Sequence, residues 1–222
     1  MPEVIFKSGD YRLEGRYVHG EGPTPPLALI LHPHPQHGGT MNNRIVYEMF
    51  HMYARRGFST LRFNFRGVGR SQGSFDHGQG ELHDAASALD WMQSHNPNSS
   101  GCWIAGFSFG AWIAMQLLMR RPEVVGFMCA SLPANMYDFG FLAPCPSSGL
   151  ILQGERDAVI PSDSVVKLVN KLSQQRGITI DFHTVEGADH FFNGHMDELV
   201  QVCEAYLDKR LKPAEKQLAM AR

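Results

Sequence analysis

The sequence feature that most restricts the fold is a Gly-x-Ser-x-Gly pentapeptide, residues 106–110, which stands between two apolar segments. Residues 102–105 form a short apolar run of the kind found in buried strands, and residues 111–119 have the length and composition of a helix. Glycines on both sides of Ser108 allow a strand and a helix to approach closely through a sharp turn. We therefore predict that Ser108 stands at the end of a strand in a strained backbone conformation.

The rest of the chain alternates short apolar runs with helical patterns, which is typical of a mainly parallel sheet covered by helices on both faces. Strands are predicted near 3–7, 11–18, 27–32, 59–65, 101–106, 124–131, 149–153 and 178–185. Helices are predicted near 42–56, 80–95, 109–121, 163–175 and 195–210. The first two strands are expected to form a hairpin, because the polar and apolar alternation of residues 11–17 implies one solvated face. The sequence therefore predicts an α/β fold with an eight-stranded sheet.

Length and composition favour one domain. The chain has 222 residues, of which 43% are hydrophobic and 19% charged, and its formal net charge is −2. Such values are ordinary for a globular protein, and nothing in them favours a nucleic-acid partner. We predict a single domain over residues 1–211, followed by a flexible tail over residues 212–222, which is rich in Lys, Ala and Glu after Pro213.

Neither a targeting segment nor a membrane span is recognisable in the sequence. The N-terminal residues 1–7 lack a basic start followed by an apolar stretch, and no segment reaches the roughly 18 apolar residues of a membrane span. The four cysteines are widely separated and indicate neither disulfides nor zinc. A cytoplasmic location is therefore expected, without a membrane partner, and a homo-oligomer remains open.

Ser108 needs partners before it can act as a nucleophile, because a serine hydroxyl requires a base that is itself oriented by a carboxylate. Asp157 follows the predicted strand 149–153, at the sheet edge where open α/β sheets place their sites. The alternative for Asp157 is a turn-forming role. His190 follows the last predicted strand by a short loop, whereas His183 lies within a strand and His195 at a helix start. The order Ser108, Asp157, His190 is therefore the candidate catalytic triad.

An acyl-transfer site also needs backbone N–H groups that stabilise the oxyanion. One predicted donor is the amide of Phe109, directly after the serine, and the other should come from the loop after strand 27–32. Prolines 33 and 35 in that loop have no amide hydrogen, so the donor is His34 or Gln36. We favour His34. The seventeen or so residues between the strands ending near 131 and starting near 149 leave room for only a loop or one short helix, so an open site is expected.

Taken together, these segments resemble the α/β-hydrolase superfamily, and specifically its small lidless serine hydrolases related to dienelactone hydrolases and short-chain esterases. The resemblance is carried by His32-Pro33-His34-Pro35, Gly38-Gly39-Thr40-Met41, Phe65-Arg66-Gly67-Val68-Gly69-Arg70-Ser71, the 106–110 motif, Gly154 to Asp157 and Ala188-Asp189-His190. It implies an acyl-enzyme mechanism with Ser108 as nucleophile, His190 as general base and then acid, and Asp157 as its orienting carboxylate. Dienelactone hydrolases proper use a cysteine nucleophile, so their substrate does not carry over.

Two other segments are similar to known binding motifs. Gly67, Gly69 and Gly73 are similar to a dinucleotide-binding motif, but their spacing is GxGxxxG and about ten residues of loop separate them from the next helix. His32, His34 and His37 could suggest a metal, yet no further ligand segment accompanies them. Turn formation and local hydrogen bonding are the favoured roles.

The sequence therefore predicts an enzyme without cofactor or metal that hydrolyses small carboxylic esters, with a small-molecule acyl compound as its substrate. A thioesterase, an acyltransferase or a peptidase would use the same three residues, so these activities remain alternatives. A binding protein that keeps this fold without turnover is a further alternative.

Overall fold

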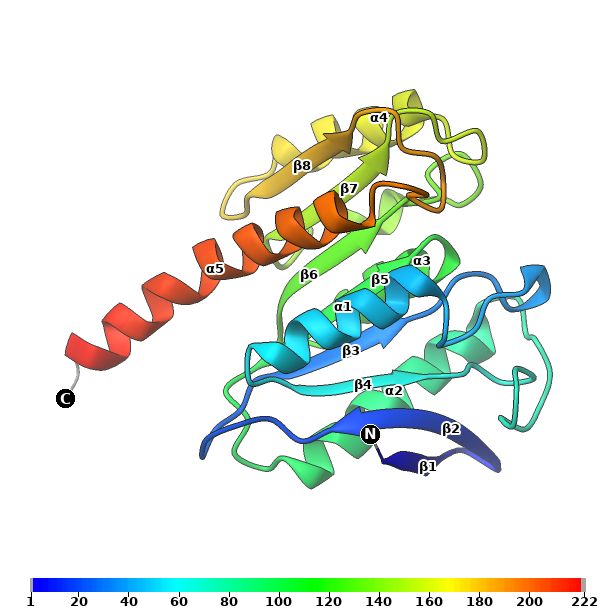
Figure 1. The fold of residues 1–222 in the computed structure, drawn as a ribbon, viewed down its shortest axis with the longest axis vertical. Helices are drawn as coiled ribbons and strands as arrows, with labels where there is room; N and C mark the ends of the chain where they lie inside the picture. Colours follow the sequence, from blue (N-terminus) through cyan, green and yellow to red (C-terminus); the bar gives the residue numbers. More distant parts are fainter. Residues whose placement is uncertain (1, 221–222) are drawn as a thin grey trace.

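The fold was examined in a computed structural model that describes residues 2–220, with side chains described up to residue 211. Its centre is one eight-stranded sheet in the order β1-β2-β4-β3-β5-β6-β7-β8 (Figure 1). The strands are β1 Glu3–Ser8, β2 Tyr11–Val18, β3 Leu27–Leu31, β4 Ser59–Phe63, β5 Cys102–Phe107, β6 Val124–Ala130, β7 Gly149–Gly154 and β8 Ile180–Val185. Strands β1 and β2 pair antiparallel as the predicted hairpin, β2 also runs antiparallel to β4, and the remaining pairs are parallel. The predicted mostly parallel sheet is confirmed.

Helices cover both faces of this sheet. They are α1 Arg44–Arg55, α2 Gln79–His95, α3 Phe109–Leu118, α4 Ser162–Ser173 and α5 Met196–Met220, with short 3-10 turns η1 Pro35–His37 and η2 Gly140–Leu142. Helices α1 and α5 pack on one face, and α2, α3 and α4 on the other (Figure 1). Alternate residues of the central strands supply the two cores: Leu27, Leu29 and Leu31 of β3 face one, and Ala28 and Ile30 the other. The central strands are consequently buried on both sides, which is why their sequences are almost continuously apolar.

Two helix ends differ from the sequence prediction. Helix α3 ends at Leu118 rather than near 121, and the Arg120 side chain donates a hydrogen bond to the Gln116 carbonyl at 2.8 Å. This bond satisfies one of the carbonyls that a helix end leaves without a partner. Helix α5 runs to Met220, beyond the predicted end near 210. Part of the tail predicted for residues 212–222 is therefore helical backbone, and residues 221 and 222 lie outside the described residues.

The turn between β5 and α3 brings three backbone segments into contact. A Cβ atom on Gly110 would collide with the carbonyl oxygens of Leu31 and His32, at the end of β3. A Cβ atom on Gly106 would collide with the carbonyl of Gly110. Both glycines of the motif are therefore needed because the first turn of α3 lies directly against the ends of β3 and β5.

Replacing Gly110 by alanine should destabilise the fold by more than about 2 kcal/mol, because the backbone atoms that the new methyl group meets cannot move aside easily. Gly177 is the control for a glycine with free space around it: its φ is +85°, unlike that of Gly110, but a Cβ atom there meets nothing within 4 Å. Gly177→Ala should therefore cost only the roughly 1–2 kcal/mol of the left-handed conformation. Urea unfolding of both variants measures the difference, and equal losses would argue against the close approach at Gly110.

Candidate active site

Ser108 occupies the turn between β5 and α3 in a backbone conformation that residues other than glycine rarely adopt. Its φ is 53° and its ψ −119°, and its amide donates a 2.9 Å hydrogen bond to the carbonyl of Ala130 at the end of β6. Helix α3 begins at the next residue, Phe109. The strand before Ser108, the helix after it and the neighbouring strand thus hold the serine in a strained backbone conformation. This arrangement is the geometry of a nucleophile elbow.

Asp157 and His190 meet at the same edge of the sheet. Asp157 lies in the loop after β7 and His190 in the loop after β8, and Asp157 Oδ2 is 2.8 Å from His190 Nδ1. The other carboxylate oxygen, Oδ1, accepts hydrogen bonds from the amides of Val159 at 2.9 Å and Ile160 at 2.8 Å. Both Asp157 and His190 are buried. The loop therefore fixes the carboxylate, and the carboxylate fixes the imidazole.

The electrostatics of this pair favour an ionised Asp157. Burial raises the pKa of Asp157, but the hydrogen bond with His190 and the bonds from the Ile160 and Val159 amides outweigh it, so the pKa lies below its ordinary value. A carboxylate can only accept, so His190 Nδ1 carries the hydrogen that it donates. In the neutral ring, Nε2 is then the basic nitrogen.

His190 also packs against the strand that carries the serine. Its ring lies 5.0 Å from the ring of Phe107, the residue before Ser108, and the Ser131 hydroxyl donates to the His190 carbonyl at 3.5 Å. The structure thus joins Asp157 to His190 directly and seats His190 beside Phe107. A hydrogen bond between His190 and Ser108 remains a prediction.

The loop after β3 lies on the other side of the elbow. The Gln36 amide donates to Nδ1 of the His34 side chain at 3.2 Å, and the His34 ring lies 5.0 Å from the ring of Phe109. Of the two donors that the sequence left open, Gln36 is therefore already engaged. The Phe109 amide, in the first turn of α3, has no acceptor within the helix. Both residues predicted to donate to the oxyanion, Phe109 and His34, lie on this side of the elbow, and their role remains a prediction.

His32, one of the three histidines considered for a metal, is a buried connector. Its Nδ1 donates to the Pro33 carbonyl at 2.7 Å, and its Nε2 accepts from the Phe65 amide at 3.0 Å. Burial lowers the pKa of His32 to about 4, while the bond to Pro33 opposes the shift, so the ring is neutral at pH 7. His32 therefore ties the loop after β3 to the loop after β4. Within the described part of the chain, no group of three His, Cys, Asp or Glu side chains could hold a metal ion.

The glycine-rich segment after β4 forms a turn rather than a phosphate cradle. The Gly67 amide donates to the Gln72 carbonyl at 3.2 Å, which closes the turn on itself. Arg66, directly before it, forms a two-pronged ion pair with the buried Asp84 of α2, with bonds of 2.8 and 3.0 Å. Helix α2 starts at Gln79, six residues after Gly73, so these glycines do not form the turn that leads into a helix.

One buried residue at the site was not identified from the sequence. Gln153, near the end of β7, is fully buried, and its amide nitrogen donates to Asp157 Oδ2 at 3.1 Å and to the Ile160 carbonyl at 2.9 Å. It therefore supports the same carboxylate oxygen that His190 contacts. The only signal in the sequence is a polar residue at the end of an otherwise apolar strand, Gly149–Gly154.

Comparisons with known proteins identify the family and the fold. Residues 18–153 match the family model described as X-Pro dipeptidyl-peptidase (S15 family). The chain belongs to this family of α/β hydrolases. A solved structure from Agrobacterium tumefaciens, described as a protein of unknown function and putative alpha/beta hydrolase, is 62% identical with a TM-score of 0.94, over 96% of this chain and 97% of that one. A Xanthomonas campestris structure, described as an a/b serine hydrolase without lid, is 26% identical with a TM-score of 0.85, over 94% of each chain.

Two curated relatives extend the comparison. An uncharacterized protein of Rickettsia prowazekii is 51% identical over 93% of this chain and 89% of its own length. The lysophosphatidylserine lipase ABHD12 of Gallus gallus is 24% identical over 93% of this chain, which spans 65% of that protein. The resemblance to small lidless hydrolases is confirmed, and the segment between β6 and β7 holds only the short turn η2 within the described residues. No described helix is long and apolar enough to cross a membrane.

Gln153→Met should raise the pKa of Asp157, because the carboxylate loses one of its hydrogen-bond donors. A carboxyl group whose pKa is lower in the folded state than in the unfolded state stabilises the fold at pH values above its unfolded-state pKa. This stabilisation is lost as the pH falls through the folded-state pKa. The variant should therefore be less stable by about 1–3 kcal/mol at pH 7. This deficit should shrink as the pH falls below the ordinary aspartate value of 3.8.

Urea unfolding across this pH range, together with carbon-13 NMR titration of the Asp157 carboxyl, measures both effects. The exposed Gln174, at the end of α4, provides the matched control Gln174→Met. A Gln153 variant whose Asp157 titrates as in the parent protein would show that the amide does not support the carboxylate.

Proposed function

We propose that this protein is a serine hydrolase that cleaves small, largely apolar carboxylic esters through an acyl-enzyme intermediate. The observation that carries the proposal is the 2.8 Å contact between Asp157 and His190 at the sheet edge where the strained Ser108 stands. Membership of an α/β-hydrolase family supports hydrolysis as the class of reaction. The lipase relative supports an ester as the bond that is cleaved.

In this proposal His190 Nε2 takes the proton of the Ser108 hydroxyl while the serine oxygen attacks the ester carbonyl. Asp157 stabilises the imidazolium that forms, because its carboxylate is ionised and already bonded to Nδ1. The amides of Phe109 and His34 stabilise the oxyanion. His190 then protonates the departing alcohol, and a water molecule, activated by the same nitrogen, releases the carboxylic acid and regenerates the serine.

The surroundings of the site favour an apolar substrate. Three of the large exposed hydrophobic side chains, Met136, Val159 and Phe191, belong to the loops after β6, β7 and β8 that surround the candidate triad. Phe191 follows His190 and lies 5.0 Å from its ring, while the Val159 amide bonds to Asp157. Exposed apolar side chains at the mouth of a site are typical of surfaces that receive apolar ligands.

Cleavage of X-Pro peptide bonds is the second candidate, because the matched family model carries that description. The same three residues would perform it, since amide and ester hydrolysis share the acyl-enzyme pathway. Turnover of Gly-Pro 4-nitroanilide, compared with 4-nitrophenyl acetate and butanoate under the same conditions, separates the two activities. Activity on the anilide alone would replace the ester assignment.

Ser108→Ala should reduce kcat for 4-nitrophenyl butanoate by at least about 10⁴-fold, because the nucleophile is removed. The parent protein should also form a covalent adduct at Ser108 with a fluorophosphonate, detectable by mass spectrometry. Ser173→Ala, at the exposed end of α4, is the matched control and should keep both properties. A parent protein that hydrolyses no ester and takes no label at Ser108 would refute the proposal in favour of a binding protein.

A further inference from the structure

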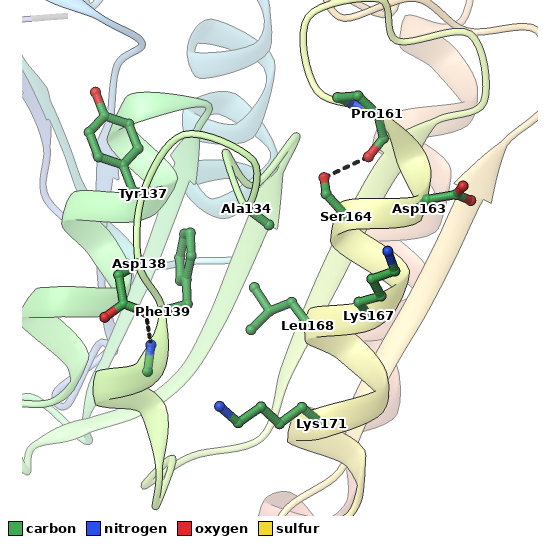
Figure 2. A pocket seen from close by; sticks show the side chains of 11 residues that line it. Ala134, Tyr137, Asp138, Phe139, Pro161, Asp163, Ser164, Lys167, Leu168 and Lys171 are labelled. Atoms are coloured by element: carbon green, nitrogen blue, oxygen red, sulfur yellow. Dashed lines mark hydrogen bonds between the residues drawn. The ribbon is translucent and has the colours of Figure 1, made fainter.

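A cleft of about 500 Å³ opens between helix α4 and the segment that follows β6. Helix α4 contributes one of its faces, formed by Ser164, Lys167, Leu168 and Lys171, which repeat at helical spacing (Figure 2). The opposite wall is formed by Tyr137 and its neighbours up to Gly140. A cleft of this volume falls within the range that holds small organic ligands.

Two residues that line this cleft neighbour residues of the candidate active site. Pro161, which lines it, follows Ile160, whose amide bonds to Asp157 at 2.8 Å. Tyr137, on the other wall, lies 6.3 Å from Phe109, the residue after Ser108, measured between ring centroids. Residues that line the cleft are thus linked to the segments that carry both Asp157 and Ser108.

The cleft combines an apolar wall with two unpaired cations. Leu168 and Phe139 are largely buried and provide the apolar surface. Lys167 and Lys171 are exposed, and among the side chains that the structure describes no carboxylate forms an ion pair with either ammonium group. By contrast, Lys209 on α5 is paired with Asp181 at 2.7 Å.

Two carboxylates, Asp138 and Asp163, also line the cleft, but among the described side chains neither forms an ion pair with these lysines. Asp138 accepts a hydrogen bond from the Gly140 amide at 2.8 Å, so its carboxylate is turned toward its own loop. Asp163 lies in the first turn of α4, where a negative charge is favourable. Lys171 instead extends across the cleft toward the segment that holds Asp138 and Phe139 (Figure 2).

We infer that the substrate carries an anionic group at the end of an apolar chain, and that this chain lies in the cleft with the anion beside Lys167 and Lys171. The inference rests on the proposed function and narrows its substrate class. Ser164 and Lys171 are seven residues apart, which places them about 10 Å apart along the helix. A chain of several methylene groups would span the apolar wall before its anion reaches the lysines.

Charge selectivity of hydrolysis tests this inference. The 4-nitrophenyl half-esters of adipate, suberate and sebacate are compared with the neutral hexanoate, octanoate and decanoate esters, which match them in chain length. At least one half-ester should be hydrolysed with a kcat/KM about 3- to 10-fold above its neutral partner, as two exposed charge pairs allow. In Lys167→Met/Lys171→Met this ratio should fall to about one, as expected once both charge pairs are lost.

Two further arms make the test specific. Lys7→Met removes an equally exposed lysine from β1, at the opposite edge of the sheet, and should leave the ratio unchanged. Acetate esters of ω-hydroxycarboxylates carry the anion on the alcohol side instead, so a preference for them rather than for the half-esters would place the alcohol portion in the cleft.

The inference and the proposed function can fail separately. If neutral esters are hydrolysed but neither the half-esters nor the acetate esters of ω-hydroxycarboxylates are preferred, or if the preference is unchanged in Lys167→Met/Lys171→Met, the inference is overturned and the esterase stands. If no ester is hydrolysed, calorimetric binding of monomethyl suberate to Ser108→Ala still decides the inference. Binding that weakens about 3- to 10-fold when Lys167 and Lys171 are also replaced supports the cleft as an anion site, and unchanged or absent binding overturns it.

Discussion

The close contact between the first turn of α3 and the ends of β3 and β5 is the constraint on which the site depends. Because Gly106 and Gly110 have no side chains, the helix can start directly over the carbonyls of Leu31 and His32. This contact holds Ser108 at a positive φ. It also brings the N-terminal end of α3 next to the loop of His34, so one packing arrangement positions the candidate nucleophile and both candidate oxyanion donors.

The neighbouring loops are then fixed by hydrogen bonds that use nearly every polar atom of a few buried side chains. His32 joins the loops after β3 and β4 through its two ring nitrogens. Asp157 accepts from two amides, from Gln153 and from His190, so its charge remains favourable despite burial. A buried carboxylate with fewer donors would take up a proton and lose its hold on the imidazole. The polar network thus sets the charge state that the proposed acyl transfer requires.

The sequence predicted the sheet, its hairpin, the five helices and the elbow, because each depends on local patterns of apolar residues and on glycine. Asp157 and His190 could be named because parallel strands end at one edge, so chain order alone places both residues after strands of that edge. Gln153 could not be found in this way. Its role depends on how a side chain in β7 reaches the next loop, which no local pattern encodes. The end of α5 at Met220 was also missed, because the sequence after Pro213 has the polar composition of a tail.

In the proposed function, residues outside the candidate triad would select the substrate. Met136, Val159 and Phe191 make the mouth apolar, and apolar contacts are strong but discriminate poorly between chain lengths and head groups. A charged side chain discriminates better between substrates with different end groups, because an anion and a neutral group of equal size differ in their attraction to an ammonium group. In the described structure Lys167 and Lys171 lie beyond an apolar wall, on a helix that begins five residues after Asp157. Attraction of the substrate by its apolar chain and selection by its charge can therefore reside in different parts of one open surface, without a lid.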